Sequence, residues 1–72
     1  MNANATFQEV MAEYNTLGSM FKKIIRNVAS DSLLEMGAQE IGSSDVNHQI
    51  VVLYRIHGDF DAIFRHGLEM CR

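Results

Sequence analysis

The sequence predicts an all-α fold built on a long amphipathic first helix, followed by a short helix and one or two further helices that form a helical hairpin. Three observations predict it. Apolar residues recur every three or four positions from residue 7 to residue 28, and the 72 residues include no proline. In addition, the pairs Thr6–Glu9 and Ser32–Glu35 have the spacing of a helix capping box. A chain of this length forms one small domain, residues 1–72.

The first predicted helix starts at Phe7, directly after its capping box. Continued to about residue 29, it is a rod of roughly 35 Å. Gly18 lies inside its apolar stripe and leaves two interpretations open. Its missing side chain can admit another helix at close range, which we favour, or the helix breaks there and restarts with Ser19 as N-cap. The stripe spans an arc of roughly 140° on the helical wheel, typical of a buried face: Phe7, Val10, Met11, Tyr14, Leu17, Phe21, Ile24, Ile25 and Val28.

Two shorter helices are expected after this helix, with an ambiguous segment between them. Ser32 and Glu35 predict a short helix over residues 33–41, with Gly42 in a left-handed conformation after its end. At the other end of the chain, Asp59 is the expected N-cap of a last helix that reaches Met70.

Residues 49–56 are ambiguous between helix and strand. They are rich in Ile and Val, which favours a strand and an α+β fold as the alternative. They also keep helical spacing, with Ser44 as a possible N-cap. A strand that is apolar on both faces needs cover on both sides. A chain with few other elements cannot provide that cover, so we favour the helix.

Composition limits the class of protein. Six Lys and Arg stand against nine Asp and Glu, and the net charge of −3 argues against a nucleic-acid binder driven by overall charge. The single cysteine, Cys71, excludes a disulfide within the chain and a cysteine-based zinc site. Residues 1–6 are polar and lack the layout of a signal peptide, and no apolar run approaches the roughly 18–20 residues that cross a bilayer. We therefore expect a cytoplasmic protein with no membrane contact.

The histidines are the residues most suited to chemistry. His48, His57 and His66 are nine residues apart, so on one continuous helix successive rings point to opposite faces and cannot share a metal. The segment from His57 to Asp59 is more simply a turn followed by a helix cap. The sequence shows no credible nucleophile–base pair and no glycine-rich phosphate loop. We expect no enzyme, no cofactor and no metal site.

One basic cluster remains, formed by Lys22, Lys23 and Arg26. It is either a solvated helix end stabilised by the helix dipole or a contact patch for an acidic surface or a phosphate backbone. Met20, on the polar side of the same helix, is a candidate for an exposed apolar contact. We expect a non-enzymatic protein-interaction module, a regulator, adaptor or inhibitor that acts through helix–helix contacts, with Met20, Lys22, Lys23 and Arg26 binding the partner.

Two further expectations concern partners. The alternative function is a small nucleic-acid-binding regulator that uses the basic cluster in a dimer. A homodimer is expected for either function, because the 72 residues leave too little chain to cover a rod of this length.

Overall fold

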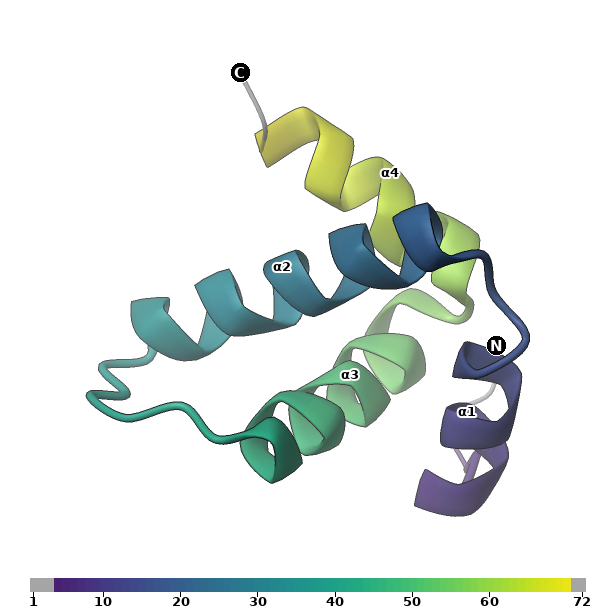
Figure 1. Ribbon diagram of the computed structural model, residues 1–72, viewed down its shortest axis with the longest axis horizontal. Helices are drawn as coiled ribbons and strands as arrows, with labels where there is room; N and C mark the ends of the chain where they lie inside the picture. The colour runs from purple at the N-terminus through teal and green to yellow at the C-terminus, as the bar shows by residue number, and fades with distance from the viewer. Residues whose placement is uncertain (1–3, 71–72) are drawn as a thin grey trace.

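Four helices make up residues 4–70, the part of the chain that the computed structural model describes (Figure 1). They are α1 (Phe7–Tyr14), α2 (Ser19–Glu35), α3 (Ser43–His57) and α4 (Phe60–Met70). No strand occurs among these residues, so the all-α prediction is confirmed. Residues 1–3 and Cys71, which entered the expectation of a cytoplasmic protein, lie outside the described part.

The start of α1 is the one that the sequence predicts. The backbone N–H of Glu9 donates to Oγ1 of Thr6, and the backbone N–H of Thr6 donates to Oε1 of Glu9, each over 3.1 Å. This reciprocal capping box satisfies two donors that have no partner within the helix. It sets the first helical residue at Phe7.

The long first helix does not form, because the chain breaks between α1 and α2. The hydroxyl of Thr16 donates to the carbonyl oxygen of Glu13 over 2.6 Å, and Gly18 is extended, with φ −65° and ψ 155°. Gly18, rather than Ser19, is the N-cap of α2. A Cβ atom on Gly18 would meet nothing within 4 Å, so no helix approaches it closely. Of the two interpretations of this glycine, the break is correct.

The end of α2 also differs from the expectation. The predicted short helix over residues 33–41 is absent, because α2 continues through Ser32 to Glu35. Oγ of Ser32 does not cap a helix but accepts a hydrogen bond from Nε2 of Gln49, 2.9 Å away on α3. The left-handed residue after the helix is Gly37, with φ 89°, and the N–H of Ala38 donates back to the carbonyl of Leu33 over 3.1 Å.

The ambiguous segment from residue 49 to residue 56 lies within α3, so the strand alternative is wrong. Its N-cap is Gly42 rather than Ser44, and a carboxylate oxygen of Asp45 accepts the N–H of Gly42 over 3.3 Å. The expected left-handed conformation at Gly42 is therefore also wrong. Gly58, with φ 99°, ends the helix.

The predicted cap of the last helix is confirmed. Oδ1 of Asp59 accepts the backbone N–H of Ala62 over 2.8 Å, and α4 follows from Phe60. The tight turn from α3 into α4 needs the positive φ of Gly58, which an L side chain rarely adopts.

The core joins all four helices. Their faces converge on four fully buried side chains, one from each helix: Val10, Ile25, Ile50 and Ile63. Aromatic rings extend this core, with Tyr54 edge-on to Phe60 at 4.9 Å and Phe21 stacked on Phe64 at 4.7 Å between ring centroids. α2 packs against both α3 and α4, and α1 packs against α3.

The described chain measures 28 × 24 × 22 Å, so the 35 Å rod that predicted a homodimer is absent. Folding back at residues 15–18 lets α1 cover α3 instead of extending α2. The dimer therefore stays a prediction without its original argument. Within residues 4–70, no helix combines the length and the apolar character that crossing a membrane requires.

Candidate functional site

The basic cluster lies in the first half of α2. Because this helix begins at Ser19, Lys22 and Lys23 are in its second turn and Arg26 follows one turn later. The cations are thus nearer the positive end of the helix dipole than the negative end, and the first turn contains no acidic residue. Stabilisation of the cluster by the helix dipole is therefore wrong, whereas the solvated surface and the contact patch both stay predictions.

Lys22 is held over an aromatic ring. Its Nζ atom lies 5.9 Å from the centre of the Tyr14 ring, within the range of a cation–π interaction. The hydroxyl of Tyr14 donates to the carbonyl oxygen of Lys22 over 3.4 Å. Tyr14 is buried, so its ring holds the lysine side chain in place from below. A neutral ring supplies no counter-ion for the lysine charge.

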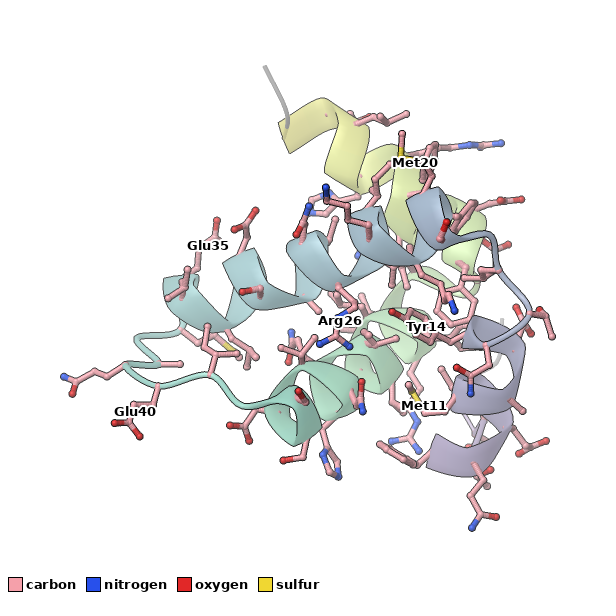
Figure 2. The ribbon with its side chains drawn as sticks, in the orientation of Figure 1. Met11, Tyr14, Met20, Arg26, Glu35 and Glu40 are labelled. Carbon is pink, nitrogen blue, oxygen red and sulfur yellow. The ribbon has the colours of Figure 1, made fainter. Side chains whose placement is uncertain are left out.

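Arg26 joins α2 to α3. Its Nη1 atom donates to Oδ1 of Asn47 over 3.4 Å, and the arginine side chain is half-buried between the two helices (Figure 2). A guanidinium has five N–H donors. The long bond to Asn47 uses one of them and neutralises none of the charge, so the group keeps most of its donors for water or a ligand.

No carboxylate within residues 4–70 forms an ion pair with Lys22, Lys23 or Arg26. The sequence has an excess of acidic over basic residues, so carboxylates are not scarce. Like charges one turn apart on a helix destabilise it by about 0.2–0.5 kcal/mol per pair. The fold therefore keeps three neighbouring cations together without the acidic partners that would stabilise them.

These cations line one shallow hollow of about 390 Å³. Tyr14 and Ser19 contribute to its lining at the start of α2. Asn27 contributes at the other end, beside Arg26. The sequence analysis missed these three neutral residues. The polar pattern of residues 19–30 could have indicated Ser19 and Asn27 as lining residues. No local pattern indicates Tyr14, because it reaches the hollow only through the turn between α1 and α2.

Met20 is not part of this hollow. Its side chain is 75% exposed, as expected of a contact residue. However, it points to the α4 side of α2, whereas Arg26 lies on the α3 side (Figure 2). The structure thus brings together three of the four predicted contact residues and separates the fourth.

The three histidines do not converge. The rings of His57 and His66 lie 5.2 Å apart between centroids, at the junction of α3 and α4. His48 packs against Phe7 instead, and its Nδ1 atom is 2.7 Å from the carbonyl oxygen of Ser44. Within residues 4–70 there is no group of three or more side chains that could hold a metal ion. The basic hollow is the better candidate for a functional site.

Comparison with known proteins adds no relative: no family model, no curated protein and no solved structure matches this chain.

Proposed function

We propose that this chain is a non-enzymatic protein-interaction module that binds an acidic surface of its partner through the basic hollow on α2. One observation carries the proposal: Lys22, Lys23 and Arg26 line the same hollow and form no ion pair within the described chain. Charge complementarity across an interface raises the association rate and selects among partners. Carboxylates from a partner would supply the counter-ions that this fold lacks.

Arg26 is the expected anchor of the contact. Its planar guanidinium can grip a carboxylate at two points, and Asn47 already restricts its motion. The two lysines act as point charges at the rim, where they attract an acidic partner over about a Debye length, roughly 8–10 Å at physiological salt. The module fits a regulator, adaptor or inhibitor, because each of these roles needs a binding surface and no catalytic group.

The test is charge reversal with a matched control. The variant K22E/K23E/R26E should lose at least about tenfold in affinity for the protein that the parent chain captures at low salt. The control R55E/R65E/R72E brings the net charge to the same −9, since each triple changes the parent value of −3 by −6. Arg72 lies outside the described residues. Circular dichroism shows whether both variants keep the helical content of the parent.

Equal capture by the two triple variants would overturn the proposal, because the contact would then depend on net charge or on another surface. Capture that persists in both variants and fails when Met20 is changed to Glu would move the binding surface to the α4 side of α2.

A further inference from the structure

The basic hollow on α2 adjoins a second hollow, which lies between α2 and the start of α3, and the two together are called the groove. Arg26 and Asn27 also line a second hollow of about 280 Å³. This second hollow runs over Ser30 on α2 to Gly42 and Ser43 at the start of α3. The two hollows share these two residues, so they adjoin at Arg26 and Asn27. Figure 2 shows Arg26 between α2 and α3, and this residue lines both hollows.

The lining of this groove has an uneven polarity. Its α2 end carries the charges of Lys22 and Lys23, and its α3 end carries the hydroxyl groups of Ser30 and Ser43. Among the described residues that line either hollow, none is acidic. Both ends therefore offer hydrogen-bond donors, but only one end offers charge.

A separate hollow shows the opposite polarity. Its volume is about 360 Å³, and Glu40 and Asp45 line it together with the apolar side chains of Leu33 and Val52. The carboxylate of Asp45 is held there by the backbone N–H of Gly42. Glu40 and Asp45 thus line a different hollow, although the carboxylate of Asp45 also bonds to Gly42 at the α3 end of the groove.

We propose that the groove binds an extended acidic peptide segment, with carboxylates at Lys22, Lys23 and Arg26 and main-chain carbonyls along Asn27, Ser30 and Ser43. This rests on the proposed function and names the form that the partner presents. The pair of adjoining hollows suits a peptide strand better than a single small anion, because the second hollow holds donors that a small anion at the lysines would not reach.

The aromatic content of the groove favours a peptide over a single-stranded nucleic acid. Proteins that bind single strands stack the bases on exposed aromatic rings. The aromatic residue among the lining residues is Tyr14, which is only 6% exposed and lies beneath Lys22. A base therefore has no open ring to stack on in this groove.

The test compares two capped peptides, of three and of eight glutamate residues, by amide chemical-shift titration at low salt. Against the parent chain, the longer peptide should bind at least about tenfold more tightly, because only it reaches both ends of the groove. The variant S43E places a negative charge at the uncharged end. It should weaken the longer peptide about tenfold and change the shorter one less than twofold.

The matched control is S44E, which adds the same charge to the next residue of α3, outside the lining of the groove. It should leave both affinities within twofold of the parent. A glutamate in the first turn of a helix interacts favourably with the dipole, so both variants should fold.

Any of four outcomes would overturn this inference. If S43E and S44E behave alike, or if the two peptides bind equally, the contact is confined to the basic hollow and the proposed function stands without the groove. If neither peptide responds to K22E/K23E/R26E, the groove is not an acidic-peptide site, and capture of the partner then decides the proposed function by itself. Tighter binding of an eight-nucleotide oligothymidylate than of octaglutamate, lost in S43E, would assign the groove to nucleic acid.

Discussion

Gly67 of α4 and Val28 of α2 lie so close together that a Cβ atom on the glycine would come within 2.5 Å of Cγ2 of the valine. The same atom would be 3.4 Å from Cγ2 of Ile24. Side-chain Cβ atoms do not approach their neighbours this closely, so α4 can cross α2 here only because the position is a glycine. The sequence analysis assigned this kind of close approach to Gly18, where the structure leaves open space.

The first prediction follows from this contact. In a helix interior Gly67→Ala would add about 1 kcal/mol of stability through helix propensity, but overpacking against Val28 costs about 1–3 kcal/mol. We expect a net loss of up to about 2 kcal/mol in the free energy of unfolding, measured by urea denaturation. In a V28A background the same change should be neutral or stabilising, because the obstructing methyl group is gone. A stable G67A protein in the parent background would show that the helices cross elsewhere.

A second prediction concerns the buried bond between α2 and α3. Gln49 is a buried polar residue, 8% exposed, and Ser32 accepts its amide N–H over 2.9 Å. Ser32→Ala removes the acceptor and leaves that donor buried, so the free energy of unfolding should fall by about 1–3 kcal/mol. The double variant S32A/Q49L removes both polar groups and should recover most of the loss. Thermal denaturation of S32A, Q49L and S32A/Q49L measures this, and additive losses in the double variant would contradict it.

Gly18 supports a third prediction, which separates stability from binding. It caps α2 without a side-chain hydrogen bond and has room for a larger side chain. Gly18→Asp would supply a cap and place a negative charge near Lys22 and Lys23, which should stabilise the fold by about 0.5–1 kcal/mol. The added carboxylate would also compete with a partner for these cations, so affinity should fall while the melting temperature rises.

The neutral control for this change is Gly18→Asn, which can cap the helix without a charge. It should stabilise the fold slightly and leave binding unchanged. Equal affinities of the Asp and Asn variants for the captured partner would argue that the lysines do not contact it.

The fourth prediction is a pH effect at the α1 cap. The pKa of Glu9 lies below its ordinary value, because its carboxylate accepts hydrogen bonds first from the backbone N–H of Thr6 and then from the Thr6 side chain. A lowered folded pKa means that the contribution to stability is present above the unfolded value, about 4.3, and is lost as the pH falls through the folded value. In T6A the pKa of Glu9 should rise but stay below the ordinary value, since the backbone donor remains.

Carboxyl carbon chemical shifts followed over pH measure this pKa in the parent and in T6A. An unchanged Glu9 pKa in T6A would show that the backbone donor alone accounts for the shift.

Local signals predicted the parts of the fold that are decided within a few residues. The Thr6–Glu9 box, the Asp59 cap and the buried faces of α1 and α2 each depend on neighbours three or four positions away. A helix over residues 49–56 could be predicted because the chain has too few other elements to cover both apolar faces of a strand there.

The errors came from contacts between distant residues. Ser32 and Glu35 have the spacing of a cap, but a partner 17 positions away on α3 takes the serine hydroxyl and α2 runs on. The break before Gly18 was hidden because the apolar residues on both sides stay in phase, and both halves bury those residues in the same core. Only the cations of the basic hollow were predicted, because they lie on one helix. Tyr14 was missed, because it reaches the hollow from α1, across the break in the chain.

The bond between Arg26 and Asn47 has a consequence for the lifetime of the protein in the cell. It joins α2 to α3 at Arg26, which lines both hollows, so the part of the groove between these helices exists only while they are packed together. A ligand that fills the groove binds the folded chain alone and, at about 100 times its Kd, adds about 2.7 kcal/mol to the free energy of unfolding. A domain of 72 residues has only about 4–10 kcal/mol in total. Proteases cleave the opened chain, so a higher partner concentration would leave less of the chain open and slow the degradation of the protein as a whole.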